Sequence, residues 1–337
     1  MPSQEKVTEL APDLPISRLL NGMWQVSGAH GSISPHVAIE EMEGYIDAGL
    51  TTWDLADHYG PAEDFVGAFR KKMEAEGKQE KLENAKFFTK WVPRPGIMPR
   101  KLVEQAVDVS RRRMGMETLD LLQFHWWDYA DQNYLEALQN LDALRQEGKL
   151  QHLALTNFDT DHWSTILQHD IEAISNQVQY SVVDTRPSQK MQAFCEAHGV
   201  QLLGYGTLCG GLLSEKFLGV KEPNSSQLNT ASLRKYKNMI DAWGGWTLFQ
   251  ELLAALKQVA DRHEISISNV AVRYVLDQPA VAGVIVGARL SVAQHIEENL
   301  KVFDTTLDEE DYAAIGAVQE RSRDLLKVIG DCGDEYR

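Results

Sequence analysis

The sequence of 337 residues contains few cysteines and no long hydrophobic run. Its three cysteines, Cys195, Cys209 and Cys332, form no C-x-x-C pair, so neither a zinc site nor a disulfide framework is indicated. No run of about 18 apolar residues occurs, and no membrane-spanning helix is therefore expected. The first residues also lack the apolar core of a secretory signal peptide, which favours a cytoplasmic location.

Positive charge is also scarce. The chain has 33 lysines and arginines against 49 aspartates and glutamates, which gives a formal net charge of −16. A phosphate-binding surface needs an excess of lysine and arginine, and an anionic membrane surface attracts basic segments. Neither nucleic acid nor a membrane is therefore an expected partner. The content of 43% hydrophobic and 24% charged residues is typical of a globular protein, and the length permits a substantial core.

Short apolar runs alternate with amphipathic helical segments along most of the chain. The runs are residues 19–24, 49–53, 85–89, 119–124, 150–155, 173–178, 200–205 and 282–286. Such alternation predicts repeated strand–helix units, and eight units close most economically as a (β/α)8 TIM barrel of the α/β class. Because no linker or shift in composition divides the chain, we predict a single domain over residues 1–337. An open doubly wound sheet is less favoured, since the segment from Gly22 to Gly28 lacks the G-x-G-x-x-G spacing.

Three stretches fall outside this alternation. Residues 1–18 are polar and are expected to form a flexible lead-in. Residues 213–246 contain glycine, serine and asparagine and are expected to form a long loop over the barrel mouth. Residues 322–337 follow the last predicted helix and are expected to form a C-terminal tail.

Polar side chains suited to acid–base chemistry close three of the apolar runs. The segment W-D-L-A-D-H-Y-G carries Asp54 and Tyr59, F-F-T-K ends in Lys90, and L-D-L-L-Q-F-H ends in His125. Because the chemistry of a parallel barrel lies at the carboxyl ends of its strands, these groups are expected to meet at one mouth. There the Lys90 ammonium would lower the pKa of Tyr59 below its ordinary value of about 10. Asp54 would hold Lys90 charged, and His125 would polarise a carbonyl oxygen.

Each of these residues also has a commoner structural role. Tyr59 beside Gly60-Pro61 fits a turn, Lys90 fits an exposed strand end, and His125 fits a buried core position. Their joint occurrence at three strand ends favours the catalytic interpretation. None of them is a hydride source, so a reduction would require a cofactor.

Together these motifs resemble those of the aldo-keto reductases over nearly the whole chain. W-D-L-A-D-H-Y-G is similar to the family's D-T-A-x-x-Y-G, with Leu55 in place of threonine, and the lysine and histidine strands also match. L-T-N-F at Asn157 and N-Q-V-Q-Y-S at Gln177 resemble S-N-F and N-Q-x-x-Y. The segment from Tyr205 to Lys216 resembles Y-S-P-L-A-G-G-L-L-T-G-K of the longer members, which include potassium-channel β subunits and bacterial, plant and fungal reductases.

The resemblance implies an oxidoreductase that interconverts a small aldehyde or ketone and an alcohol, with NADPH or NADH bound across the mouth. Tyr59 would donate the proton and His125 would orient the carbonyl. Asn157 and Gln177 would bind the carboxamide, Tyr205 would stack on the nicotinamide, and glycines would admit the pyrophosphate. The full set of implied cofactor contacts is Gly22, Met23, Trp24, Asp54, Asn157, Gln177, Tyr205, Gly206, Leu208, Gly210, Gly211, Lys216, Arg289, His295, Glu298 and Asn299.

The segment from Ile285 to Asn299 bears on the choice of cofactor. It resembles the family's P-G-A-R-x-P-E-Q-L-E-E-N, with two extra residues after Arg289 and with His295 where glutamine or arginine is usual. Arg289, followed by a helix expected over about 292–300, would favour the 2′-phosphate of NADP(H) over NAD(H). Alternatively, Arg289 is an ordinary surface arginine.

Aromatic side chains near the mouth are expected to line the substrate site. The candidates are Trp24, His58, Trp91, Trp126 and Trp127. Flat apolar walls with a few polar donors suit aldehydes, aromatic ketones, quinones and sugars alike.

Two other functions stay open. One is a cofactor-binding regulatory protein with marginal turnover, like the channel β subunits, although the short lead-in contains no candidate inactivation segment. The other is a metal-dependent hydrolase that uses Asp54, Asp57, His58 and His125. The chain has no H-x-H or H-E-x-x-H motif, and Lys90 would repel a cation, so this function is the least favoured.

Overall fold

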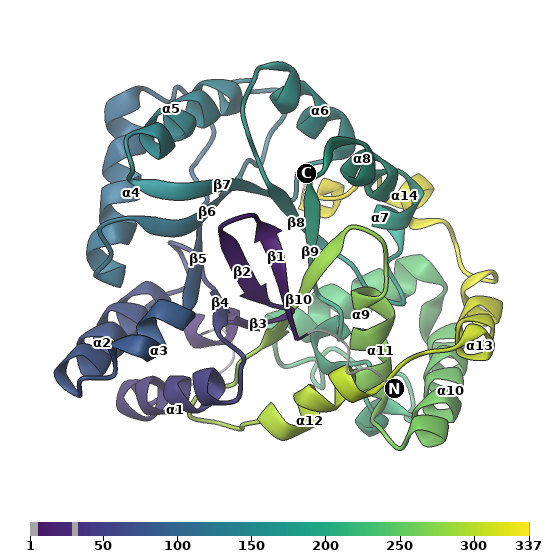
Figure 1. Cartoon of the computed structure of the whole chain (residues 1–337). Coiled ribbons are helices and arrows are strands. Elements are labelled where there is room, and N and C mark those ends of the chain that lie inside the picture. The colour runs from purple at the N-terminus through teal and green to yellow at the C-terminus, as the bar shows by residue number, and fades with distance from the viewer. Residues whose placement is uncertain (1–5, 29–32, 337) are drawn as a thin grey trace.

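The computed structural model describes residues 6–28 and 33–336. Within this part of the chain, eight parallel strands form a closed barrel in the order β10-β3-β4-β5-β6-β7-β8-β9 (Figure 1). They are β3 (Leu19–Gly22), β4 (Thr52–Asp54), β5 (Lys86–Trp91), β6 (Leu119–His125), β7 (Leu150–Thr156), β8 (Ser175–Gln179), β9 (Gln201–Tyr205) and β10 (Val281–Gly287). Each coincides with one of the apolar runs, and the predicted single-domain (β/α)8 barrel is confirmed.

Helices cover the outside of the barrel (Figure 1). They are α1 (Pro35–Asp47), α2 (Ala62–Ala75), α3 (Gln79–Asn84), α4 (Arg100–Met114), α5 (Tyr134–Gln146), α6 (Thr160–Gln168), α7 (Arg186–Gln189), α8 (Met191–His198), α9 (Ala231–Trp243), α10 (Gly245–His263), α11 (Ile267–Leu276), α12 (Ile296–Leu300), α13 (Glu309–Gln319) and α14 (Leu325–Val328). In α4 the buried residues Val103, Val107 and Met114 recur at helical spacing and form its inner face. Gly115 ends this helix in the left-handed conformation, with φ of 63°.

A β-hairpin at the N-terminus closes the end of the barrel opposite the mouth. It consists of β1 (Val7–Ala11) and β2 (Leu14–Ser17), which pair antiparallel. Its side chains Leu10, Leu14 and Ile16 are buried in one cluster with inward-facing barrel residues such as Phe88. The expectation of a flexible lead-in is therefore wrong for residues 7–17, and residues 1–5 lie outside the described part.

The stretch 213–246 is more helical than predicted. It contains α9 and the first residues of α10, so the expected long loop is wrong for its second half. Helix α9 begins at the N-cap Thr230, whose side chain accepts a hydrogen bond from the Leu233 amide, and it buries Tyr236 and Ile240. The expected C-terminal tail includes α14 and a short turn over Asp334–Tyr336, and it packs on the barrel.

Candidate active site

A buried ion pair lies at the carboxyl end of the barrel. Lys90, in β5, donates a hydrogen bond of 2.6 Å to Asp54 Oδ2, at the end of β4, and another of 2.8 Å to the Leu55 carbonyl. Parallel pairing places β4 beside β5, which explains how residues 36 positions apart meet. Burial lowers the pKa of Lys90, and the Asp54 charge opposes that shift.

Two glutamine side chains complete the surroundings of Asp54. Gln123 Nε2 and Gln177 Nε2 donate to Asp54 Oδ1 over 2.9 and 2.7 Å, and Gln177 also donates to Gln123 Oε1 over 2.7 Å. Gln177 was predicted from the sequence, whereas Gln123 was not. Alternation along β6 offered a signal, because Leu121, Gln123 and His125 share one face of that strand.

Tyr59 lies beside this pair, on the loop after β4. The Lys90 Nζ atom is 5.2 Å from the centroid of its ring, and the Trp24 ring packs edge-on at 5.0 Å. Burial raises the pKa of Tyr59 well above its ordinary value, and Asp54, Tyr336 and Asp57 raise it further. The expectation of a pKa below the ordinary value is therefore wrong for this structure, in which desolvation of the phenol is the largest effect on its pKa.

Arg113 fixes the loop that carries Tyr59. From the end of α4 it donates to the carbonyls of Asp57 and Gly60 over 3.1 and 2.8 Å, and it pairs with Glu63 and Asp64. A run of arginines at a helix end, as at residues 111–113, is commonly solvated, but the Arg113 side chain ties α4 to this loop.

His125 is buried at the end of β6, 5% exposed, on the same rim as the Asp54–Lys90 pair. Its ring lies 4.4 Å from the Trp127 ring and 6.0 Å from the ring of Tyr336, in the C-terminal segment. The structure thus brings the four predicted catalytic groups to one end of the barrel, and it adds Tyr336, which the sequence did not indicate.

The residues expected to hold a nicotinamide lie directly after β7, on β8 and at the end of β9. Asn157 has a left-handed backbone, with φ of 56°, which is uncommon for a residue other than glycine. The Tyr205 hydroxyl lies 2.9 Å from Asn157 Oδ1, 3.1 Å from the Tyr336 hydroxyl and 3.4 Å from Glu335 Oε1. The C-terminal segment thus occupies the position in front of Tyr205.

Helix α9 packs against the glycine-containing loop after β9. A Cβ atom on Gly206 would lie 2.3 Å from the Tyr236 hydroxyl, and one on Gly210 would lie 3.0 Å from the Tyr236 ring. Both glycines have positive φ, and they are therefore required for packing whether or not the loop receives a phosphate. Lys235, on the same helix, places its ammonium 5.0 Å from the Tyr205 ring centroid. Lys216 and Gly211 are exposed.

Two of the expected cofactor contacts, Leu208 and Asn299, line a cavity of about 10 Å³ together with Asn269. The Asn269 side chain donates to the Glu298 carbonyl over 2.8 Å. Arg289 and His295 are exposed. Helix α12 begins only at Ile296, because residues 289–293 form a turn. The expected start of this helix at about residue 292 is therefore wrong. As a result, no helix N-terminus lies directly after Arg289 in the sequence.

The predicted contacts near β3 differ in exposure. Met23 is fully buried, and its amide donates to the Asp54 carbonyl over 2.9 Å. Gly22 faces Ile285 of β10 closely, since a Cβ atom there would lie 2.7 Å from that side chain. Trp24 is exposed and approaches both Tyr59 and His58.

Not all aromatic candidates face the mouth. Trp126 is fully buried in the core, and its indole N–H donates to the carbonyls of Asp128 and Asp131, so its expected contact with substrate is wrong. Trp91 is largely buried against Phe124. Trp127 is partly exposed next to His125, and His58 is exposed with a hydrogen bond to Asp57.

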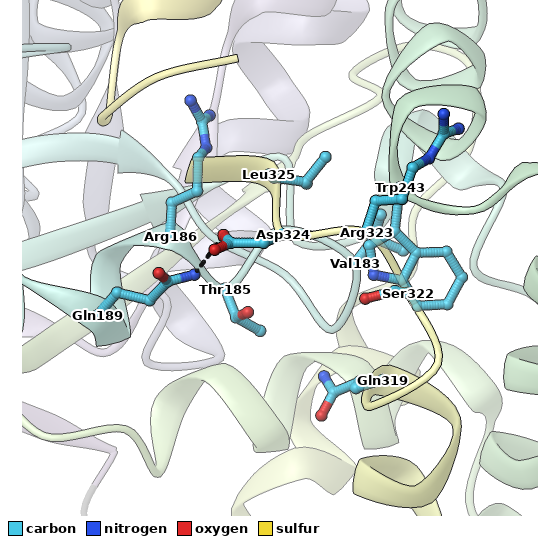
Figure 2. Close-up of a pocket in the computed structure, with 10 residues that line it drawn as sticks. All are labelled: Val183, Thr185, Arg186, Gln189, Trp243, Gln319, Ser322, Arg323, Asp324 and Leu325. Atoms are coloured by element: carbon cyan, nitrogen blue, oxygen red, sulfur yellow. Dashed lines mark hydrogen bonds between the residues drawn. The ribbon is translucent and has the colours of Figure 1, made fainter. Parts of the chain in front are cut away.

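A cavity of about 220 Å³ lies between the chain that follows β8 and the chain that follows α13 (Figure 2). Its lining residues are Val183, Thr185, Arg186, Gln189, Trp243, Gln319, Ser322, Arg323, Asp324 and Leu325. Figure 2 shows Asp324 accepting a hydrogen bond from Gln189, while the Arg186 guanidinium points away from Gln319. Gln319, Ser322 and Arg323 thus border this cavity where the chain leaves α13.

Within residues 6–28 and 33–336, no group of three or more His, Cys, Asp or Glu side chains is arranged to hold a metal ion. No helix in that part of the chain is long and apolar enough to cross a membrane.

The residue types at the mouth fit a nicotinamide cofactor, whereas their present arrangement leaves little space for it. Asn157 and Tyr205 offer polar groups at the strand ends, and Leu208 and Asn299 line one cavity. Tyr336 and Glu335 nevertheless lie on the Tyr205 hydroxyl. The site therefore has the side chains for a nicotinamide and is covered by its own C-terminal segment.

Comparison with known proteins places these features in context. Residues 18–320 match the model of the "Aldo/keto reductase family". Flagellar radial spoke protein 5 of Chlamydomonas reinhardtii is 30% identical over 180 residues, which cover 48% of this chain and only 34% of that protein. The NADH-specific methylglyoxal reductase of Escherichia coli is 23% identical over 320 residues, covering 89% and 93% of the two chains. The glycerol dehydrogenase of Gluconobacter oxydans has the same fold, with a TM-score of 0.75 at 22% identity over 97% of each chain.

Proposed function

The chain belongs to the aldo/keto reductase family of nicotinamide-dependent oxidoreductases, and we propose that it interconverts a small aldehyde or ketone and the corresponding alcohol. The observation that carries this proposal is the buried Asp54–Lys90 pair directly beside the Tyr59 phenol, with His125 on the same rim. A phenol, an ammonium and an imidazole at one barrel mouth can donate a proton to a carbonyl oxygen and orient it.

Tyr59 is the proposed proton donor. A phenol, with an ordinary pKa of about 10, is protonated at neutral pH, which is the state required for donating a proton during carbonyl reduction. The Lys90 ammonium, 5.2 Å from the ring, would stabilise the phenolate left after that transfer. Asp54 and its two glutamine partners hold Lys90 in place.

His125 would hydrogen-bond to the carbonyl oxygen beside Tyr59 and align it for proton transfer. A bound nicotinamide would supply or accept the hydride. The side chains that would hold the nicotinamide end are Asn157, Gln177 and Tyr205. Glu298 and Asn299 are proposed for the adenine end, and Leu208 for the pyrophosphate.

For the cofactor we propose NADP(H), with Arg289 on the 2′-phosphate. Arg289 is exposed in the turn after β10 and lies ten residues before Asn299 in the sequence. An exposed guanidinium at this position could bind a phosphate, which supports the assignment. The Escherichia coli relative is named as NADH-specific, so a preference for NADH is the competing outcome.

The test titrates purified protein with NADPH and with NADH, following tryptophan fluorescence, and then adds a panel of aromatic and aliphatic aldehydes. Saturable quenching together with loss of reduced-nicotinamide absorbance, unaffected by a chelator, would support the proposal. Binding without turnover of any carbonyl would instead favour a regulatory cofactor-binding protein. Absence of binding to either cofactor would refute both.

A further inference from the structure

Tyr336 spans the barrel mouth from the histidine strand to the strand that carries Tyr205. Its ring centroid lies 6.0 Å from that of His125 and 5.9 Å from that of Trp127. On the other side, its hydroxyl is 3.1 Å from the Tyr205 hydroxyl and accepts a hydrogen bond from Lys235. Strands β6 and β9 are separated by β7 and β8, so a single side chain bridges two sides of the mouth.

This position conflicts with catalysis as proposed. A carbonyl substrate has to reach His125 while the nicotinamide lies against Tyr205, and the reacting atoms have to approach within about 3–3.5 Å. The Tyr336 ring occupies the space between these two residues. The docked segment and a productive complex therefore exclude each other.

We propose that residues Cys332–Tyr336 form a C-terminal latch that closes the mouth of the free protein and has to leave it when the cofactor binds. The inference rests on the proposed function, because it assigns a form of regulation to the same site. Cofactor and latch would compete for one position in front of Tyr205.

The anchoring of the latch permits its release. Glu335 Oε2 accepts a hydrogen bond of 2.9 Å from Arg186 Nη2, in a fully buried guanidinium. Asp184 contacts the same guanidinium at Nε and at Nη2, both over 2.8 Å. When Glu335 leaves, Arg186 keeps its ion pair with Asp184, so release leaves no unpaired buried charge.

The chain around the latch also permits movement. Gly330 and Gly333 have φ of 111° and 90°, conformations that glycine adopts at little cost. Gln319 and residues 322–325, which precede the latch, line the cavity of about 220 Å³ and so border open space (Figure 2). Open space beside a segment lowers the free-energy cost of its local opening.

Competition of this kind has a measurable consequence. The apparent dissociation constant of the cofactor equals its intrinsic value divided by the fraction of molecules with an open latch. If about one molecule in ten is open, removal of the Tyr336 ring tightens cofactor binding about tenfold. Tyr336→Phe, which keeps the ring and loses the hydroxyl contacts, should give a smaller gain.

The experiment measures calorimetric affinity for NADPH and NADH in the full-length protein and in Tyr336→Ala, Tyr336→Phe and Glu335→Gln. Val328→Ala is the matched control, because this residue of α14 lies in the same segment and is half exposed. The second readout is labelling of the Cys332 thiol by dithionitrobenzoate, with Cys332→Ser as the reference. The thiol belongs to the latch and is buried while the latch is docked, so its reactivity reports release independently of turnover.

The latch predicts tighter cofactor binding in Tyr336→Ala, an unchanged affinity in Val328→Ala, and faster labelling of Cys332 when cofactor is added. The latch would be overturned if wild type and Tyr336→Ala bound cofactor with equal affinity and if cofactor did not change the labelling of Cys332. Because cofactor would still bind normally, that result would leave the proposed function intact. Failure of every protein to bind either cofactor would overturn both.

Discussion

Removal of one charge from the Asp54–Lys90 pair should cost more stability than removal of both. The pair is buried, and its single ion-pair contact is 2.6 Å long. Lys90→Met leaves the Asp54 carboxylate with the amide donors of Gln123 and Gln177, and Asp54→Asn leaves the Lys90 ammonium with the Leu55 carbonyl. Breaking a buried pair in this way typically costs about 3–5 kcal/mol.

The double variant Asp54→Asn/Lys90→Met retains no buried charge, so it should be less destabilised than either single variant. The coupling free energy, which is the sum of the two single costs minus the cost of the double variant, should therefore exceed the larger single cost and be at least about 3–5 kcal/mol. Lys90→Met should be the milder single change, because two amide donors still solvate Asp54. Urea unfolding at pH 7, followed by tryptophan fluorescence, measures all four proteins. Similar m-values would show that the variants share one folded state.

The exposed pair Lys257–Asp261 on α10 provides the control cycle, in which the coupling should be only about 0.3–0.5 kcal/mol. If the costs of the two single changes at Asp54 and Lys90 simply add in the double variant, the two charges are not coupled. That result would refute the structural role assigned to this pair.

Three further predictions concern the surroundings of the site and the fold. Gln123→Leu leaves Asp54 and Gln177 each without one hydrogen-bond partner. The kcat should therefore fall about tenfold or more, and the pH profile of reduction should shift. If Gln123 has a purely structural role, only the melting temperature should fall. Arg289→Ala should weaken NADPH binding about tenfold and leave NADH binding nearly unchanged; equal losses would remove Arg289 from the cofactor site. Glu43 is bonded to Lys78, Lys81 and Lys72, which lower its pKa from 4.5 to about 2. Because the pKa of Glu43 is lower in the folded state, its contribution to folding stability is present above about pH 4.5 and is lost as the pH falls towards 2. Glu43→Gln should therefore reduce the free energy of unfolding by about 1 kcal/mol at pH 7, and by progressively less in acid unfolding experiments.

The barrel could be predicted from the sequence because its strands are repeated, apolar and separated by helices that have one apolar face. The same regularity placed Asp54, Lys90 and His125 at the ends of neighbouring strands. In the barrel, the local sequence pattern and the overall topology favour the same structure, so few alternative folds compete with it.

The remaining features depend on contacts between distant residues. The N-terminal hairpin is short, and its apolar residues Leu10, Leu14 and Ile16 acquire a partner surface only when the barrel closes. Tyr336 is one tyrosine in a polar segment, and its place beside His125 follows from docking on Arg186, about 150 residues earlier, which leaves no trace in local sequence. The raised pKa of Tyr59 likewise reflects burial, which composition and spacing do not report.

The most direct test of the central claim is single-turnover reduction of an aromatic aldehyde by Tyr59→Phe, with cofactor affinity measured on the same protein. Tyr312→Phe on α13 is the matched control, since its hydroxyl bonds Asp277 away from the mouth. The account predicts unchanged cofactor affinity in both variants, and a rate that falls about 10²–10⁴-fold in Tyr59→Phe alone. A Tyr59→Phe enzyme that retains most of its rate would contradict the assignment of Tyr59 as proton donor.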